Sequence, residues 1–310
     1  MRILVLGSTG YLGAHVAERL RTVPGVLVLD GGRRPGAGVP VDLAADSTGR
    51  LAGILASAAP DAVVNCAGAT GGDPVALAEA NARGPAVLCA ALGRAAPGAR
   101  LVHLGSAAEY GPGTPRVRTP ESAPTRPLTP YGATKLAGTV AVTASALDAV
   151  VLRVGNPVGP GAPVTGLPGR VAGLLRAAGP DPDAVLRLGD LSAFRDFVDV
   201  RDVAAAVERA VTAPKPLPRV LNIGGGEAVP VRRLVRTLAE TAGFRGRIEE
   251  QGAGSARSGQ VSWQCSDITA ARSALGWRPT YPVEASLAAL WAAVTGEAAP
   301  SRHLESDCVT

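Results

Sequence analysis

A glycine-rich turn near the N-terminus restricts the fold of this chain more than any other sequence feature. The segment Gly7-Ser8-Thr9-Gly10-Tyr11-Leu12-Gly13 directly follows an apolar run at residues 3–6 and opens an amphipathic stretch. In a strand–turn–helix unit, Gly7 permits the tight turn, Gly10 lets the backbone approach a pyrophosphate, and Gly13 allows the helix to pack closely. Amides at the helix N-terminus then face the phosphates. The turn therefore predicts a dinucleotide-binding site that includes Thr9, Tyr11 and Leu12.

Apolar runs and helical stretches alternate through the first half of the chain. Expected strands cover residues 3–6, 26–29, 62–65, 101–104 and 150–154, and expected helices cover residues 12–22, 51–58, 74–94 and 129–146. Repeated alternation of this kind predicts a parallel sheet covered by helices on both faces. We therefore expect an α/β fold, with a Rossmann-type doubly wound parallel sheet and a smaller mixed α/β substrate-binding domain.

Glycine and proline crowd residues 155–168, and the alternation ends there. We expect an NAD(P)-binding Rossmann domain over residues 1–155, to which the chain returns near residues 197–212. A substrate-binding portion is expected over residues 156–295. Residues 296–310 are expected to form a disordered tail.

Composition narrows the range of functions. The chain has 310 residues, 46% hydrophobic and 18% charged, so it can bury a large core. Its net charge of +5 is scattered, which argues against nucleic-acid binding and suits small anionic ligands. No apolar run is long enough to span a membrane, and no signal pattern precedes the first strand, so we expect a cytoplasmic protein without membrane contact. Four cysteines without paired spacing and three scattered histidines predict no disulfide framework and no metal site.

The region after the second expected strand bears on the choice of cofactor. Asp30 ends that strand, and its carboxylate can accept hydrogen bonds from the adenosine ribose while repelling a 2′-phosphate. Arg33 and Arg34 follow and can reach such a phosphate, although both also suit a solvated loop. Asp42, with Leu43 beside it, is placed to meet the adenine, although an aspartate there also suits a helix cap. We expect NAD, with NADP as the alternative.

Tyr131 and Lys135 lie four residues apart in an expected helix, so both project from one face. An isolated phenol has a pKa near 10, so acid–base work at neutral pH requires about 4 kcal/mol of preferential phenolate stabilisation. A nearby ammonium and a cationic nicotinamide can supply it. Lys135 is one of only two lysines among 31 basic residues, which favours a functional role over a packed tyrosine beside a surface lysine.

Ser106 follows the fourth expected strand, at the carboxyl end where sheets of this kind bind ligands. Its hydroxyl can hydrogen-bond a substrate alcohol or ketone beside Tyr131, whereas a serine in such a loop would by itself suit a turn. His103 lies within the apolar strand and is expected to be a core residue. No Ser-His-Asp arrangement accompanies Ser106, so hydrolysis is disfavoured.

Together these features resemble the extended short-chain dehydrogenase/reductase family, in particular its NAD-dependent epimerase/dehydratase group. The resemblance runs over nearly the whole chain. Its motifs, which are specific for the family but not for a substrate, are Gly7–Gly13, Val64–Gly68, Asn81, Gly105–Gly111, Pro130–Lys135, Leu152–Pro160, Arg195–Val203 and Leu275–Pro279.

The resemblance implies a catalytic triad of Ser106, Tyr131 and Lys135, in which Lys135 also holds the nicotinamide ribose. It further implies cofactor contacts at four positions, namely Asn65, Ala67, Gly68 and Asn81. Substrate contacts are implied for Ser106 and Ala107, and contacts with the diphosphate of a sugar nucleotide for Asn156, Arg195 and Arg257. Arginine suits that bidentate role. A homodimer would also follow family habit.

The positions after Ser106 bear on the type of reaction. Sugar 4,6-dehydratases that resemble this chain carry an acidic pair there, where this chain has Ala107 and Ala108. Glu109 lies one step further on, where strand alternation would turn it away. Dehydration is therefore disfavoured. We expect an NDP-hexose 4-epimerase, which needs only the triad and a tightly held NAD.

Three alternatives stay open. The segment Leu188–Phe197 resembles GDP-4-keto-6-deoxymannose reductases, which favours an NAD(P)H-dependent reductase of an NDP-4-keto-6-deoxyhexose. A non-sugar natural-product intermediate with a secondary alcohol would use the same triad. The third alternative is a non-catalytic cofactor-binding protein, although such relatives usually lose the tyrosine or the lysine, and both are present here.

Overall fold

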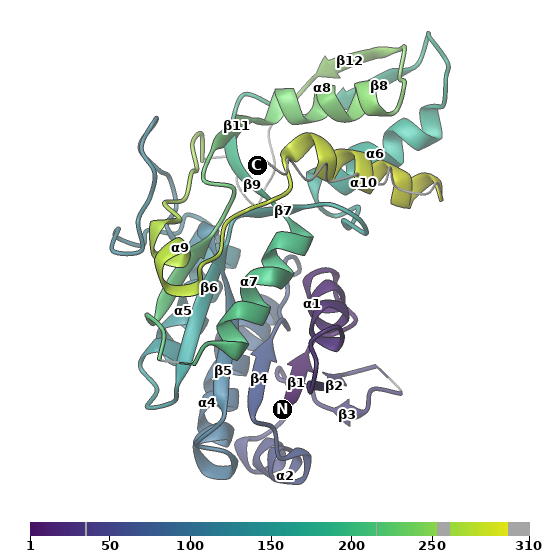
Figure 1. Ribbon diagram of the computed structural model, residues 1–310. Coiled ribbons are helices and arrows are strands. Elements are labelled where there is room, and N and C mark those ends of the chain that lie inside the picture. The colour runs from purple at the N-terminus through teal and green to yellow at the C-terminus, as the bar shows by residue number, and fades with distance from the viewer. Residues whose placement is uncertain (35, 215, 253–260, 297–310) are drawn as a thin grey trace, which may run out of the picture.

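A computed structural model describes residues 1–34, 36–214, 216–252 and 261–296. Within these residues, seven strands form one parallel sheet in the order β10-β6-β5-β4-β1-β2-β3 (Figure 1). The strands are β1 (Arg2–Leu6), β2 (Leu27–Gly32), β3 (Val39–Pro40), β4 (Ala62–Asn65), β5 (Arg100–Ser106), β6 (Ala149–Val154) and β10 (Val220–Ile223). The chain runs outward from β1 to β3 and then crosses to β4 on the other side of β1. This doubly wound sheet confirms the predicted Rossmann-type fold, and such sheets bind ligands where the strand order reverses.

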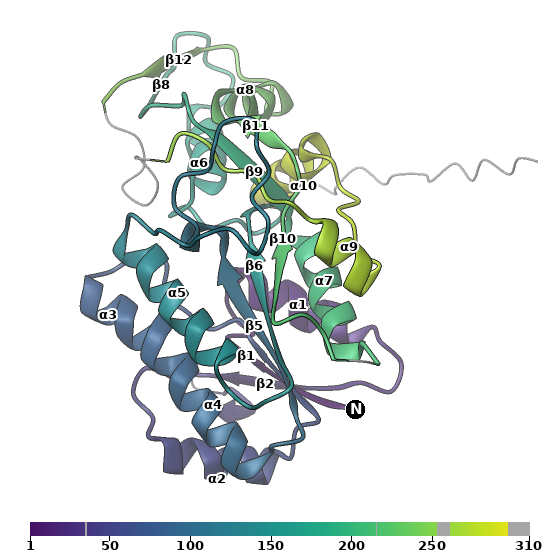
Figure 2. The same cartoon turned by 90° about the vertical axis from the view of Figure 1, so that its left-hand side faces the viewer.

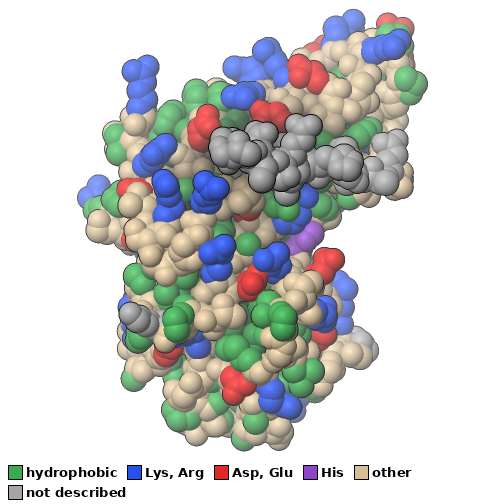
Figure 3. Space-filling view, viewed as in Figure 1, with side chains coloured by type: hydrophobic (Ala, Val, Ile, Leu, Met, Phe, Trp, Pro, Cys, Tyr) green, Lys and Arg blue, Asp and Glu red, His purple; other side chains and the backbone are tan. Residues whose placement is uncertain are grey.

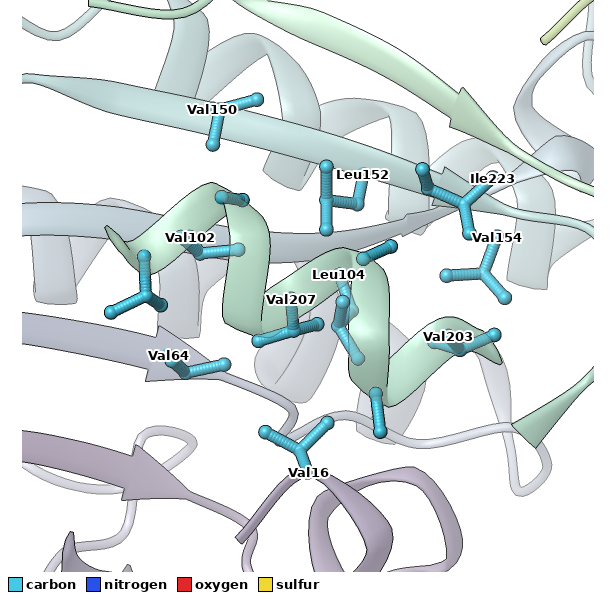
Figure 4. Packing of buried hydrophobic residues seen from close by; sticks show 14 of the residues in the cluster. Val16, Val64, Val102, Leu104, Val150, Leu152, Val154, Val203, Val207 and Ile223 are labelled. Atoms are coloured by element: carbon cyan, nitrogen blue, oxygen red, sulfur yellow. The ribbon is translucent and has the colours of Figure 1, made fainter. Parts of the chain in front are cut away.

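Helices cover both faces of this sheet (Figure 2). One face carries α2 (Thr48–Ala58), α4 (Gly84–Ala95) and α5 (Pro130–Thr143), and the other carries α1 (Tyr11–Arg21), α7 (Val200–Thr212) and α9 (Thr269–Leu275). Because successive strand residues point to opposite faces, Leu4 packs under α2 and α4, whereas Val5 packs under α1 and α7. Figure 4 shows Val207 of α7 pointing toward the strands that carry Leu104 and Leu152. The sheet is therefore buried on both faces.

A smaller mixed α/β region lies beyond the carboxyl ends of the strands, at the top of Figure 1. It contains a three-stranded sheet in the order β11-β9-β7 and a parallel pair of β12 and β8. Its elements are β7 (Asn156–Val158), α6 (Leu167–Ala178), β8 (Val185–Leu188), β9 (Phe194–Asp199), β11 (Ala228–Pro230), α8 (Val231–Thr241), β12 (Arg247–Glu250) and α10 (Val283–Thr295). A separate hydrophobic cluster joins α6, α8 and α10 and includes the fully buried Val171, Leu234 and Leu290.

Three elements that follow β9 in the sequence belong to the large sheet. α7 and α9 pack on its face, and β10 pairs with β6 at its edge. The domain boundary expected at residue 155 stays a prediction. Of the expected tail, only Gly296 is described, and residues 297–310 lie outside the described residues. Among the described helices, none combines the length and the apolar character that a membrane crossing requires.

The helix expected over residues 74–94 is divided into three parts. α3 (Pro74–Ala78) leads into a π-helical turn at Glu79–Arg83, and α4 follows. Pro85 has no N–H to donate to the carbonyl of Asn81, so the regular ladder is interrupted there. The same carbonyl oxygen faces Gly138 of α5, where a Cβ would come within 2.2 Å of it. The turn thus directs Asn81 into the protein, and π-helical turns of this kind are frequent at functional sites.

Candidate active site

Two cavities open at the carboxyl ends of the strands. The larger, about 960 Å³, runs from the glycine turn past Ser106 and Tyr131 to Arg195 on β9. The smaller, about 600 Å³, lies between the length of α1 and the end of β2. Figure 3 shows Lys and Arg side chains gathered across the middle of the molecule, where the large sheet meets the smaller region. The glycine turn lies between the two cavities, as binding of a dinucleotide across both would require.

The glycine turn has the geometry of a pyrophosphate cradle. Gly7 has a φ of +77°, and a Cβ on it would lie 2.9 Å from the backbone of Ala67. A Cβ on Gly13 would lie 2.0 Å from the carbonyl oxygen of Gly7. α1 begins directly after Gly10 without a side-chain cap and without an acidic residue in its first turn. Its first amides therefore suit an anionic ligand.

The first turn of α1 also contacts the smaller region. Tyr11 and Leu12 line the larger cavity, and the Tyr11 hydroxyl donates a hydrogen bond of 3.5 Å to the carbonyl of Gly159. Nε2 of His15 lies 3.0 Å from the carbonyl oxygen of Pro160. Burial raises the pKa of Tyr11, so this phenol stays neutral. The N-terminal half of α1 and the loop after β7 are thus in direct contact.

The smaller cavity contains an ion pair that the sequence did not reveal. Nη2 of Arg21 lies 2.6 Å from Oδ2 of Asp30, which is inside β2 rather than at its end. Asp30, Arg21 and Arg34 line the smaller cavity, whereas Arg33 is exposed and does not line it. The Arg21 guanidinium offsets the repulsion between Asp30 and a 2′-phosphate, so this end is compatible with both NAD and NADP.

Asp42 and Leu43 do not reach either cavity. Oδ1 of Asp42 accepts a hydrogen bond from the amide of Ala44, so its carboxylate stabilises a local turn. The side chain of Leu43 is buried in the cluster under α2 and α4. The helix cap considered for Asp42 is instead supplied to α2 by Ser47.

Arg34→Ala should affect binding of the adenine nucleotide that carries a 2′-phosphate and not binding of the one that lacks it. We expect it to weaken binding of 2′,5′-ADP about tenfold and to leave binding of 5′-AMP unchanged, because only the former presents a phosphate to this guanidinium. Isothermal titration calorimetry measures both ligands. Arg33→Ala is the matched control, since Arg33 lies outside the cavity lining. An equal loss for both nucleotides would contradict the assignment.

Asn65 and Asn81 hold the loop that follows β4. Oδ1 of Asn65 accepts the amide of Ala67, and its Nδ2 lies 3.1 Å from Nδ1 of His103. Asn81 brackets Ala69, since its Oδ1 accepts the Ala69 amide and its Nδ2 donates to the Ala69 carbonyl. Neither asparagine lines a cavity, so the structure gives their side chains a supporting position. Gly68 does line the larger cavity.

Tyr131 and Lys135 lie on one face of α5, which starts at a Thr129 cap followed by Pro130. Tyr131 lines the larger cavity. Lys135 is buried, its Nζ donates to the carbonyl of Leu104 at 2.5 Å, and a Cβ on Gly68 would lie 4.0 Å from that Nζ. Burial lowers the pKa of the Lys135 ammonium, while the Glu109 carboxylate acts in the opposite direction. The ammonium therefore lies directly behind the cavity wall.

Ser106 is the last residue of β5 and lines the larger cavity beside Ala107 and Ala108. Its Oγ accepts a hydrogen bond from the amide of Ala108 at 3.2 Å. Because a hydroxyl has one donor and two acceptor sites, this contact leaves the Ser106 proton for a ligand. His103 is a core residue, and burial holds its pKa well below its usual range, so it is neutral.

Glu109 turns away from the cavity, although not through strand alternation. After Ser106 the chain forms a short 3₁₀ helix, Ala107–Glu109, which directs the Glu109 side chain into the interior. There it forms a buried ion pair with Arg153 of β6, 2.7 Å between Oε2 and Nε. The acidic residue that dehydration requires beside Ser106 is therefore missing from the described lining of that part of the cavity.

The far end of the larger cavity is basic. Among the described lining residues, three arginines (Arg170, Arg187 and Arg195) face one aspartate, Asp190, and the remaining charge of +2 suits a diphosphate. Burial lowers the pKa of Arg195, so an anionic ligand would offset part of its desolvation cost. Nδ2 of Asn156 donates to Oε1 of Gln264. Arg257, also expected at the diphosphate, lies outside the described residues.

Several lining residues were not expected from the sequence. Arg170, Arg187, Gln251 and Gln264 come from α6, β8 and two loops of the smaller region. No local motif marks them, because only the packing of that region brings them to the cavity. Glu109 did carry a signal, since Ser106-Ala107-Ala108-Glu109 fits a capping box. Within the described residues, no three His, Cys, Asp or Glu side chains gather as metal ligands would.

Comparisons with known proteins agree with this geometry. Residues 3–224 match the NAD dependent epimerase/dehydratase family. A dTDP-6-deoxy-L-talose 4-dehydrogenase (NAD(P)(+)) from Kitasatospora kifunensis is 38% identical over 306 residues, which cover 94% of this chain and 95% of that protein. A UDP-glucose 4-epimerase from Mycolicibacterium smegmatis is 30% identical over 303 residues, which cover 90% and 94%.

A solved structure agrees in fold over nearly the whole chain. MoeE5 in complex with UDP-glucuronic acid and NAD superposes with a TM-score of 0.82 at 28% identity, and the alignment covers 96% of this chain and 99% of that chain. The similarity therefore includes both the large sheet and the smaller region.

Proposed function

Since the chain belongs to the NAD dependent epimerase/dehydratase family and is an NAD(P)-dependent enzyme of nucleotide-sugar modification, we propose that it oxidises or reduces C4 of a nucleotide-linked 6-deoxyhexose. One observation carries this proposal. Ser106 and Tyr131 line a single cavity that has the cofactor turn at one end and arginines at the other. The relative with 38% identity, a dTDP-6-deoxy-L-talose 4-dehydrogenase, supports the choice of C4 and of a 6-deoxy sugar.

In the proposed reaction, the protein moves one proton while the nicotinamide, when bound, accepts or donates the hydride. Tyr131 takes the proton of the C4 hydroxyl during oxidation and returns it to the C4 oxygen during reduction. Ser106 donates its hydroxyl proton to the same oxygen, because its acceptor side already holds the Ala108 amide. The Lys135 ammonium behind Gly68 favours the phenolate form of Tyr131 electrostatically.

The lining of the cavity around Ser106 and Tyr131 favours a sugar without a charged group. Around Ser106 and Tyr131, the described lining residues include Ala107, Ala108 and Leu128, and no charged lining residue comes from these segments. A C6 carboxylate would require a cation at this end, whereas a C6 methyl group suits alanine and leucine. The cationic side chains lie at the other end, where the diphosphate would bind.

A screen of sugar nucleotides tests the proposal. The purified protein is incubated with dTDP-, UDP- and GDP-linked 6-deoxyhexoses plus NAD⁺ or NADP⁺, and with the 4-keto forms plus NADH or NADPH. We expect a change in nicotinamide absorbance that matches, mole for mole, a mass change of two hydrogens in the sugar. Sugars with a C6 hydroxyl or carboxylate should react at least about tenfold more slowly. Cofactor turnover with none of these sugars would contradict the proposal.

A 4-epimerase is the second candidate, because the Mycolicibacterium relative is a UDP-glucose 4-epimerase and the triad alone meets the needs of that reaction. Such an enzyme would interconvert C4 epimers without added cofactor and without net change in nicotinamide absorbance. It would also release NAD on acid denaturation. The two candidates therefore differ in whether cofactor is consumed.

A further inference from the structure

Glu109 holds Ser106 in place from inside the protein. Its Oε1 accepts the backbone amide of Ser106 at 2.8 Å, while Oγ of Ser106 accepts the amide of Ala108. These reciprocal bonds form a capping box at the end of β5. They fix both the backbone and the side chain of a residue that lines the cavity.

The Glu109 carboxylate itself has little freedom to move. It has no exposed surface, and its second oxygen pairs with Arg153, whose side chain is only 6% exposed. The Arg153 guanidinium also stacks on the Tyr110 ring, 4.5 Å from its centroid. On the opposite side, a Cβ on Gly105 would come within 2.7 Å of Oε1 of Glu109, so only glycine leaves room for this carboxylate. Packing thus holds the Glu109 carboxylate in one position.

Three buried charges therefore act together behind the cavity wall. Lys135 and Arg153 are cations, and Glu109 is the anion: its charge opposes the burial that lowers the pKa of Lys135, and it raises the pKa of Arg153 against the effect of burial. The neighbouring titratable groups are neutral, because burial raises the pKa of Cys66 to about 12, raises the pKa of Tyr110 and lowers the pKa of His103. Glu121 accepts the amide of Asn222, and its charge also raises the pKa of Tyr110.

We propose that Glu109 is a positioning residue for the reaction. It fixes Ser106 through the backbone amide of that residue, and it reduces the net buried charge that acts on Tyr131 from +2 to +1. The inference rests on the proposed function for the role of Tyr131. Without Glu109, Lys135 and Arg153 would both favour the phenolate. Without Arg153, Glu109 would cancel Lys135. The two substitutions therefore have opposite expected effects on the ionisation of Tyr131.

A titration of the phenol tests the charge effect without a substrate. Phenolate absorbance is followed with pH in the NAD-saturated protein. For each variant, the absorbance of the same variant carrying Tyr131→Phe is subtracted, which removes the signals of the other tyrosines. We expect Glu109→Gln to lower the pH of half-ionisation of Tyr131 by about one unit and Arg153→Gln to raise it by about one unit. The double variant should return to the wild-type value.

The outcomes separate clearly. Unchanged ionisation in a folded single variant, or a double variant that does not return to the wild-type value, would overturn the proposal. Where one single variant does not fold, the other decides by the sign of its effect. Where neither folds, a double variant in which the pH of half-ionisation of Tyr131 departs from the wild-type value overturns the proposal. A circular dichroism melt identifies which case applies. This readout does not depend on which sugar is turned over.

Turnover then tests the contact with Ser106. The Glu109→Gln variant keeps a side-chain oxygen that can accept the Ser106 amide, whereas the Glu109→Ala variant has none. We therefore expect Glu109→Ala to lower kcat about tenfold more than Glu109→Gln, with a smaller effect on KM. Equal losses in kcat would show that the amide contact does not matter for the reaction. If no sugar is turned over by the wild type, the proposed function fails while the titration result stands.

Discussion

Tyr131→Phe is expected to lower kcat about 1000-fold while leaving the affinity for NADH within about twofold of the wild-type value. The substitution removes the hydroxyl that exchanges a proton with the C4 oxygen, and general acid–base catalysis of this kind contributes about 10²- to 10⁴-fold. The ring remains, so the shape of the cavity is kept. Initial rates from nicotinamide absorbance and NADH fluorescence titrations measure the two quantities.

Tyr281→Phe is the matched control for this loss. Tyr281 lies under the Arg201 guanidinium at 3.7 Å and does not line either cavity, so we expect activity close to that of the wild type. The role assigned to Tyr131 would be wrong if Tyr131→Phe kept more than about a tenth of the wild-type kcat.

Gly13→Ala is expected to weaken NADH binding about 100-fold. The new Cβ would lie 2.0 Å from the carbonyl oxygen of Gly7, so the turn or the start of α1 has to move. Overpacking of this kind costs about 1–3 kcal/mol, and the displaced backbone is the part that would bind the pyrophosphate. NADH fluorescence gives the affinity, and a thermal melt without cofactor gives the change in stability.

Gly53→Ala is the matched control, because it adds the same methyl group at a position where that group causes no steric clash. Gly53 lies in α2, and a Cβ on it would meet nothing within 4 Å. We expect normal NADH affinity and a gain of up to about 1 kcal/mol in the free energy of unfolding, because alanine favours the helix. Equal NADH affinities for Gly13→Ala and Gly53→Ala would show that the glycine turn does not bind the cofactor.

The sequence predicted those parts of the site that depend on short spacings. Gly7–Gly13 follows β1 directly, and the four-residue spacing of Tyr131 and Lys135 places both on one helix face without any tertiary information. Ser106 could be placed because strand ends in a parallel sheet share one edge. The structure brings Ser106 and Tyr131 to one cavity and buries Lys135 behind it.

The remaining features depend on contacts between segments that are distant in the sequence. Arg21 pairs with Asp30 only because α1 packs beside β2. Asn65 and Asn81, expected as cofactor contacts, use their side chains to hold the backbone of a loop. Strand alternation was the wrong rule for Glu109, because the strand ends at Ser106, where Ser106 and Glu109 form a capping box at the start of a 3₁₀ helix.

The return of α7 and β10 to the large sheet has a consequence for how this protein can be made. Among the described helices, only α1 covers the apolar face that carries Val5 and Leu152 until the ribosome has synthesised α7, so most of this face stays exposed. Trp277, whose indole donates to the carbonyl of Asp202, completes the cover much later still. A gene cut after β6 would therefore encode a fragment that exposes this face and aggregates, rather than a separable cofactor-binding module.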